Sequence, residues 1–217
     1  MHNPSKVTSP MAQPRRPRLA LPAGSCDSHV HVYGPASRFP FDPHRPYTPE
    51  DAPVEQLDAL HRWLGLERAV YVQATVHGFD NAAILDAIAR NPSQARGIAL
   101  VHTDIGGAAL QSLHAAGVRG VRFNFIKHLG DAPDPQAVLR LAERIGAMGW
   151  HVQLHFGAQD LLDQLPLLHR LQCPFAIDHM GRTPVAGGLA QEACIALLDV
   201  LADPRAWIKL SLSLIHI

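Results

Sequence analysis

The sequence predicts an α/β protein, a (β/α)8 barrel of the TIM type that is incomplete because its eighth strand is missing. Short apolar runs alternate strictly with longer helical stretches, and there are seven such runs. The runs are nearly continuous in apolar residues, as expected for parallel strands that are covered on both faces. No glycine-rich phosphate-binding turn follows the first run, which argues against a doubly wound dinucleotide-binding fold.

Local signals place the individual elements. The predicted strands are 26–33, 68–73, 96–101, 120–123, 150–155, 175–177 and 207–210. The predicted helices between them are 54–64, 81–90, 107–116, 135–148, 160–171 and 191–202. Asp80 or Asn81 can cap the second helix, and Asp134 can cap the fourth, which has a proline at its first position. Glycines stand where three helices should stop, at Gly65, Gly117 and Gly149.

Composition favours one globular domain, which we place at residues 24–211. The 217 residues are 47% hydrophobic and 18% charged, enough for a sizeable core. Lys+Arg and Asp+Glu balance at 19 each, and no apolar run is long enough to span a bilayer, so we expect no nucleic acid and no membrane as partner. Cys26, Cys173 and Cys194 are odd in number and lack metal-ligand spacing, which favours a reducing, cytoplasmic setting. Composition does not predict an oligomeric state.

The two ends of the chain differ from this domain. Residues 1–23 are rich in proline and arginine and lack the apolar centre of a secretory signal, so we expect a disordered, weakly basic tail. Residues 212–217 match the translation of a common sequencing adapter, and we interpret them as non-native. The alternative is a native hydrophobic last strand.

Histidines stand at the predicted strand ends, where a barrel of this type places its active site. His29 and His31 alternate on the first strand, so their side chains should share one face. His155 ends the fifth strand and His179 follows the sixth. Each of them alone could be structural, but four at one mouth predict a site that binds a metal or a polarised substrate oxygen.

Other histidines and the tryptophans are assigned structural places. Those on predicted helices, His61, His114 and His169, should be exposed. Trp63, Trp150 and Trp207 should be core or interface aromatics.

Five motifs stand in order along the chain: Asp-Ser-His-Val-His-Val-Tyr-Gly-Pro at 27–35, Tyr-Thr-Pro at 47–49, Ala-Gly-Val-Arg-Gly-Val-Arg-Phe-Asn-Phe at 116–125, Gly-Trp-His-Val at 149–152 and Asp-His-Met-Gly-Arg at 178–182. Together they resemble the amidohydrolase superfamily, and most of all its 2-pyrone-4,6-dicarboxylate lactonase branch. The resemblance covers about residues 22–211.

The resemblance implies a role for each matched residue. His29, His31 and His179 would surround and polarise the scissile lactone carbonyl. Arg122 and Arg182 would bind substrate carboxylates, for which a planar guanidinium is well shaped. Further substrate contacts would come from Tyr47, Thr75, His77, Lys127 and His128.

Two residues depart from the branch pattern. His128 stands where we expect an arginine, which weakens the case for an identical dicarboxylate substrate. His155 stands where we expect a tyrosine, and it restores the histidine of metal-binding relatives. The branch works without a metal, so we favour no cofactor. The alternative is a divalent ion, zinc or manganese, held by His29, His31, His155 and His179.

The sequence therefore predicts a hydrolase that opens a carboxylate-bearing lactone in the catabolism of aromatic or sugar-derived acids. One alternative is a metal-dependent amidohydrolase or decarboxylase of the same superfamily. The other is a non-catalytic module that binds a small molecule. In the superfamily an aspartate after strand eight acts as general base, and none of Asp178, Asp199 and Asp203 can replace it. We therefore expect the 217-residue chain to be inactive as it stands.

Overall fold

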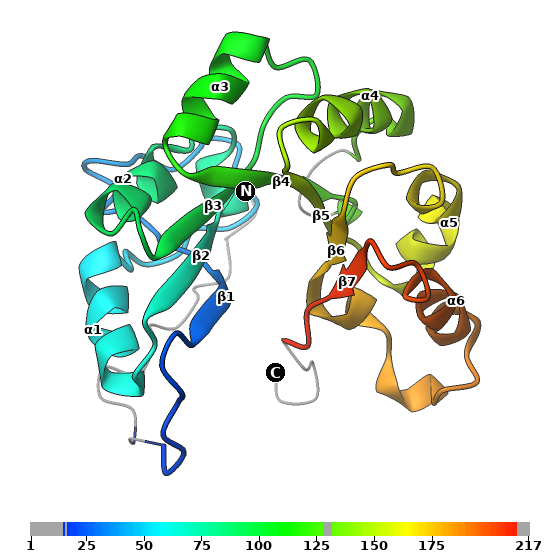
Figure 1. Cartoon of the computed structure of the whole chain (residues 1–217), viewed down its shortest axis with the longest axis horizontal. Coiled ribbons are helices and arrows are strands. Elements are labelled where there is room, and N and C mark those ends of the chain that lie inside the picture. The colour runs from blue at the N-terminus through cyan, green and yellow to red at the C-terminus, as the bar shows by residue number, and fades with distance from the viewer. Residues whose placement is uncertain (1–14, 16, 128–131, 212–217) are drawn as a thin grey trace. The chain divides into compact units, whose positions relative to one another are not determined.

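The structure, a computed structural model, describes residues 15, 17–127 and 132–211. Strands and helices alternate along this part of the chain (Figure 1). The strands are β1 (Cys26–Val30), β2 (Arg68–Val72), β3 (Ala95–Ala99), β4 (Val118–Asn124), β5 (His151–His155), β6 (Phe175–Ile177) and β7 (Ala206–Ile208). The α-helices are α1 (Val54–Leu64), α2 (Ala82–Arg90), α3 (Gly107–Ala115), α4 (Pro135–Gly146), α5 (Ala158–Leu168) and α6 (Glu192–Val200). Short 3-10 turns are η1 (Thr75–His77), η3 (Asp178–Arg182) and η4 (Val185–Gly187).

The strand pairs within each unit are parallel, and neighbours follow chain order. β1 pairs with β2 and β2 with β3, while β4 pairs with β5, β5 with β6 and β6 with β7. These pairings and the regular alternation confirm the predicted α/β class and the incomplete (β/α)8 type, with seven strands among the described residues.

The chain divides into two compact units. The first unit contains residues 1–100 and 111–118, and the second contains residues 101–110 and 119–217, each over its described part. β1, β2 and β3 with α1 and α2 lie in the first unit, and α4, α5 and α6 with β5, β6 and β7 lie in the second.

Apolar faces of the helices build the core of the first unit. Val54 of α1, Ile84 and Ile88 of α2, and Ala69 and Tyr71 of β2 are buried in one cluster. The helices therefore cover one face of the strands in this unit, while Val72 and Ile98, on the opposite face, are buried as well.

The second unit shows the same arrangement. In α4 the residues Val138, Leu141, Ala142 and Ile145 are buried, at the spacing of one helix face. Trp150, just before β5, has no exposed surface, as predicted for a core aromatic. Trp63 and Trp207 are 47% and 67% exposed, so neither belongs to the core.

Several predicted helix ends are confirmed. The Asp134 carboxylate accepts the backbone N–H groups of Gln136 and Ala137 at the start of α4, with Pro135 in the first turn. Gly65 ends α1 in the left-handed conformation, with φ at 80°. The Asp80 carboxylate accepts the N–H of Ala82 at the start of α2.

The side chain of Asn81 does not cap α2, which was one of the two predicted possibilities. Its amide group bonds the backbone of Leu100 in both directions, as donor to the carbonyl oxygen and as acceptor from the N–H group. It therefore ties the start of α2 to the end of β3.

The first strand is shorter than predicted. β1 ends at Val30 rather than at residue 33, because Tyr33 leaves β2 and forms an antiparallel bridge with Ala52. Between Asp27 and Val30 the register against β2 shifts by one residue. Regular alternation therefore does not extend from His29 to His31.

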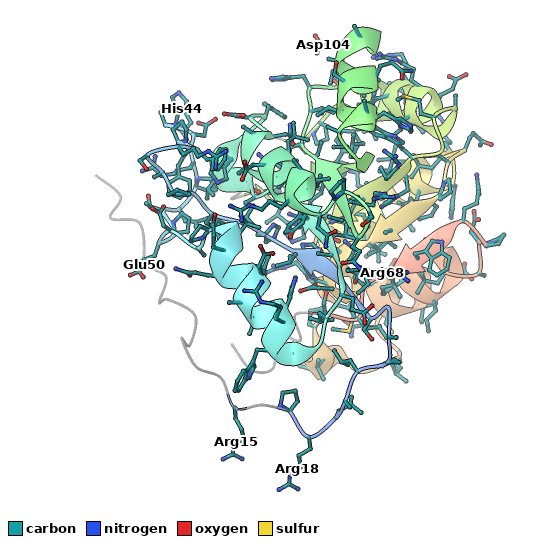
Figure 2. The ribbon with its side chains drawn as sticks, turned by 60° about the vertical axis from the view of Figure 1, so that its left-hand side comes forward. Arg15, Arg18, His44, Glu50, Arg68 and Asp104 are labelled. Carbon is teal, nitrogen blue, oxygen red and sulfur yellow. The ribbon has the colours of Figure 1, made fainter. Side chains whose placement is uncertain are left out.

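Some expectations lie outside the described residues. These concern the tail over residues 1–14 and 16, His128, and the segment 212–217. Arg15 and Arg18 are described, and both are exposed and point away from the rest of the first unit (Figure 2). None of the described helices is long and apolar enough to cross a membrane.

Candidate active site

Two histidines lie side by side at the end of β1. His29 Nε2 and His31 Nε2 are 3.4 Å apart, and the rings meet edge to face. His31 Nδ1–H donates to the carbonyl oxygen of Val72 at 2.8 Å, so the Nδ1 atom of His31 carries the proton. In a neutral His31 ring, Nε2 is then the acceptor. The predicted pairing of His29 and His31 is present, although His31 lies beyond the strand.

An aspartate and a helix histidine hold this segment. Asp27 Oδ1 accepts the backbone N–H of His29 at 3.1 Å, and Asp27 Oδ2 accepts from His61 Nε2–H at 3.1 Å. Burial by itself raises the pKa of Asp27, but the hydrogen bonds from His61 and His29 outweigh it and lower that pKa. His61 is only 8% exposed, so the prediction that it is exposed was wrong. No local signal links the two residues, which lie 34 positions apart in the chain.

The His77 side chain holds the loop of residues 34–41 against η1. His77 Nδ1–H donates to the carbonyl oxygen of Pro40 at 3.2 Å, and Nε2 accepts the N–H of Gly34 at 3.4 Å. The Phe41 ring packs on the imidazole, and His77 is 4% exposed. Both ring nitrogens are therefore engaged by the backbone of residues 34–41. Thr75 and Tyr47, the other substrate contacts predicted in this unit, are half-buried.

In the second unit, four polar side chains on or directly after successive strands form a largely buried group, called here the polar layer: Arg122, Gln153, Asp178 and Lys209. Arg122 Nε–H donates to Asp178 Oδ2 at 2.8 Å, and Gln153 Nε2–H donates to the same oxygen at 2.9 Å. Lys209 Nζ–H donates to Gln153 Oε1 at 2.7 Å. Of these four residues, sequence reasoning found only Arg122. Asp178 was part of the motif at 178–182 but received no role in the site, and Gln153 and Lys209 have no motif spacing that would have singled them out.

Next to the polar layer lie the predicted histidines of this unit. His155 ends β5, and its Nδ1–H donates to Asn124 Oδ1 at 3.0 Å. His179 Nδ1 is hydrogen-bonded to Ser211 Oγ at 2.9 Å. The two imidazoles meet edge to face with centroids 5.4 Å apart. The second unit therefore brings His155 and His179 together, as predicted.

His155 is held neutral. Burial, and after it the charge of Arg122, lower the pKa of His155 to about 2. Its Nε2 atom is buried and has no hydrogen-bond partner in the described part of the chain. A neutral ring that donates through Nδ1 presents a lone pair on Nε2. This atom can accept a hydrogen bond or coordinate a metal ion.

The backbone around His179 is unusual. His179, Met180 and Arg182 have φ of 54°, 55° and 48°, in the left-handed region that non-glycine residues rarely adopt. The Met180 N–H donates to the carbonyl oxygen of Lys209 at 3.1 Å, which ties this turn to β7. Such strain gathers at functional sites, where surrounding structure enforces it. Arg182 is half-buried, and Lys127, after β4, is exposed.

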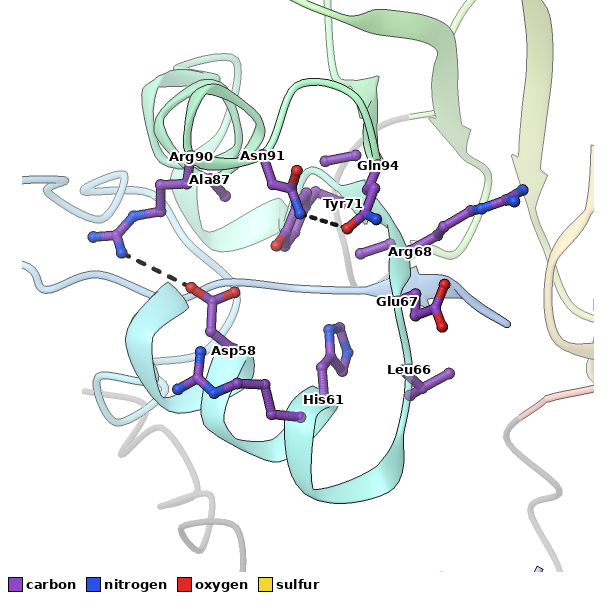
Figure 3. Close-up of a pocket in the computed structure, with 13 residues that line it drawn as sticks. Asp58, His61, Leu66, Glu67, Arg68, Tyr71, Ala87, Arg90, Asn91 and Gln94 are labelled. Atoms are coloured by element: carbon purple, nitrogen blue, oxygen red, sulfur yellow. Dashed lines mark hydrogen bonds and ion pairs between the residues drawn. The ribbon is translucent and has the colours of Figure 1, made fainter. Parts of the chain in front are cut away.

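A separate hollow of about 420 Å³ lies in the first unit, between α1 and α2 (Figure 3). Its walls include Asp58, Arg68, Tyr71, Arg90 and Gln94. Arg68 and Gln94 lie at the amino-terminal ends of β2 and β3, opposite the strand ends that carry function in this fold. We therefore do not assign function to this hollow. Each unit instead carries its own candidate functional group, the histidine pair in the first unit and the polar layer with His155 and His179 in the second.

Comparisons with known proteins identify the family. The sequence pattern of the amidohydrolase family matches residues 26–214. The 2-pyrone-4,6-dicarboxylate hydrolase of Comamonas testosteroni is 45% identical over 201 residues, 92% of this chain and 66% of that protein. The 4-sulfomuconolactone hydrolase of Rhizobium radiobacter is 37% identical, over 89% of this chain and 65% of that protein.

A solved structure agrees. The probable 2-pyrone-4,6-dicarboxylic acid hydrolase of Acinetobacter baumannii, with citric acid bound, has a TM-score of 0.78 at 27% identity, over 87% of this chain and 70% of that one. This chain spans about two thirds of the length of the curated relatives that it matches. The match over nearly the whole described sequence shows that the chain belongs to the amidohydrolase family.

Proposed function

We propose that the protein is a lactone hydrolase whose substrate bears carboxylates, of the 2-pyrone-4,6-dicarboxylate type. The observation that carries the proposal is a buried arginine, Arg122, beside neutral His155 and strained His179. This combination offers a cation for a substrate carboxylate next to imidazoles for a carbonyl. The named activity of the 45% identical relative supports the same class of reaction.

In the proposed reaction a water oxygen attacks the lactone carbonyl carbon. The ring C–O bond then breaks, and the leaving oxygen takes up a proton, so the products are a carboxylic acid and a hydroxyl compound. His29, His31 and His179 would polarise the carbonyl, and Arg122 and Arg182 would hold the carboxylates. Groups already set in place for the developing negative charge lower the barrier without further reorganisation.

Further predicted contacts stay part of this proposal. Tyr47, Thr75 and Lys127 would add hydrogen bonds to the substrate, and the resemblance implies the same for His128. For His77, the backbone bonds described above favour holding the loop over binding the substrate. Activation of the attacking water by an aspartate after an eighth strand is implied by the resemblance alone.

A divalent ion is the second candidate, and one observation favours it. The unpartnered lone pair of buried, neutral His155 Nε2 suits a metal ligand. His29, His31, His155 and His179 are the residues that would hold zinc or manganese, which would polarise a carbonyl or activate water. Near one equivalent of zinc or manganese in the purified protein would contradict the metal-independent form.

We also propose a cellular compartment and a metabolic role for the protein. Cys26, Cys173 and Cys194 are free cysteines, which suits a reducing compartment such as the cytoplasm. We further propose a role in catabolism of aromatic or sugar-derived acids, in keeping with the names of the relatives.

The test is turnover by the product of the complete reading frame. The panel contains 2-pyrone-4,6-dicarboxylate, 4-sulfomuconolactone and an uncharged aldonic lactone as control. We expect hydrolysis of the anionic lactones and a KM for them that rises in Arg122→Met. Binding without turnover would support a non-catalytic binding module instead, and turnover of the uncharged lactone alone would contradict the assigned substrate class.

A further inference from the structure

The polar layer follows from the strand register of the second unit. Arg122 on β4 is the register partner of Gln153 on β5, and Gln153 is in turn the partner of Ala176 on β6. Asp178 follows β6 directly, at the start of η3, and its carboxylate contacts Arg122 and Gln153. Ile177 and Ile208 are partners, so Asp178 and Lys209 stand in equivalent positions at the ends of β6 and β7.

Both oxygens of the Asp178 carboxylate face cations. Oδ2 accepts from Arg122 Nε–H and from Gln153, and Oδ1 lies 3.4 Å from Lys209 Nζ. Asp178 has no exposed surface, and the Arg122 and Lys209 side chains are 4% and 14% exposed. Burying such charges is costly unless each is paired, so removing any one of the three side chains leaves another buried charge without its partner.

The polar layer carries a net positive charge. Two cations and one carboxylate leave one net positive charge, buried beside His155 and His179. Arg122 uses Nε–H for Asp178, and the described residues provide no other hydrogen-bond partner for this guanidinium. Its two Nη groups are then the donors that can bind a carboxylate in a bidentate manner.

We propose that Asp178 is a positioning residue: it fixes the plane of the Arg122 guanidinium so that the Nη groups meet a substrate carboxylate, while Gln153 and Lys209 hold Asp178 in place. This inference rests on the proposed function, because it takes Arg122 as the carboxylate-binding residue. It also gives the carboxylate next to His179 a role other than general base, since no surface of Asp178 is open to water.

The first arm of the test measures turnover by the product of the complete reading frame. Asp178→Asn keeps the size of the side chain and removes its charge. We expect KM for 2-pyrone-4,6-dicarboxylate to rise about tenfold to a hundredfold, the effect of losing one charge-assisted hydrogen bond. We expect kcat to change less than about threefold and the shape of the pH profile to stay the same. Exposed Asp163→Asn, on α5, makes the same charge change and should leave KM unchanged.

The second arm needs no turnover. The nitrogen-bound proton of Arg122 Nε gives its own NMR signal, which hydrogen bonding to a buried carboxylate protects from exchange with water. We expect a protected signal in the parent protein that shifts when 2-pyrone-4,6-dicarboxylate is added. We expect Asp178→Asn to lose that protection. If the single variant Asp178→Asn does not fold, the double variant Asp178→Asn with Lys209→Met is used in its place in both measurements. The double variant removes one charge of each sign, so the net charge of the polar layer is unchanged.

The outcomes separate the two proposals. In one outcome, the parent protein turns over no lactone while its Arg122 signal shifts with the dicarboxylate only when Asp178 is present. That result would contradict the proposed hydrolase activity and support the positioning role of Asp178. A thousandfold loss of kcat at constant KM, with loss of the acidic limb of the pH profile, would make Asp178 a base and overturn the inference. An unchanged KM and an unchanged Arg122 signal in the variant would overturn it as well.

Discussion

The neutral state of His155 makes a quantitative prediction about stability against pH. His155 is 6% exposed, and its pKa is lowered to about 2, chiefly by burial and next by the charge of Arg122. In the unfolded chain its pKa returns to about 6.5. Below pH 6.5 the unfolded state therefore binds a proton that the folded state does not.

The sign and size follow from this difference. The stabilising contribution of neutral His155 is fully present above pH 6.5 and is lost as the pH falls towards the folded pKa. The loss is about 1.4 kcal/mol for each pH unit below 6.5. Between pH 7 and pH 4.5 the free energy of unfolding should therefore fall by about 2.5 kcal/mol because of this one side chain.

Urea unfolding of the parent chain and of His155→Gln, at pH 7 and pH 4.5, measures this contribution. Glutamine cannot take up the proton, so the free energy of unfolding of the variant should depend less on pH, by about 2.5 kcal/mol over this interval. His169→Gln, in an exposed position after α5, controls for the loss of an imidazole. Equal pH dependence in the parent chain and His155→Gln, or an NMR titration of His155 with a midpoint near 6.5, would refute the reasoning.

Three further predictions follow from contacts in the two units. His61→Leu should raise the pKa of Asp27, measured by carbon NMR of the carboxyl group, because the hydrogen bond from His61 is the largest influence that lowers it; an unchanged pKa would mean that this bond is absent in solution. The Asp27–His61 pair should also contribute stability above the ordinary pKa of aspartate, and that contribution should disappear as the pH falls through the lowered value. Trp150→Ala should lower the free energy of unfolding by about 3–5 kcal/mol in urea titrations, since it empties a fully buried site, and a loss below about 1 kcal/mol would contradict that placement. His77→Ala should speed trypsin cleavage after exposed Arg38, because both ring nitrogens of His77 hold the backbone of residues 34–41; an unchanged cleavage rate would show that the loop is held by other contacts.

Much of the fold could be predicted from local sequence, because its signals act over a few residues. The alternation of apolar runs and helical stretches identified the seven strands and six helices among the described residues. The cap at Asp134 and the left-handed Gly65 were predictable because both satisfy backbone groups of the nearest turn. Strand ends were less predictable, and β1 is three residues shorter than expected: 26–30 against 26–33.

The candidate site was predictable in its histidines and less so in their surroundings. His29 with His31, and His155 with His179, lie together as expected, because strand ends in this fold meet at one side. His61 was expected to be exposed, since its helix position carries no sign of the carboxylate at Asp27, 34 residues away in the chain.

The sequence by itself determined the family, the order of the elements and the identity of the histidines, because motifs and periodicity are local properties. Only the tertiary structure decided their chemical states. His155 is neutral because burial and the charge of Arg122, on another strand, lower its pKa. Asp178 lies between two cations because Arg122 on β4 and Lys209 after β7 reach its carboxylate. The protonation state of a buried group depends on the side chains that surround it in space, and these come from segments far apart in the chain.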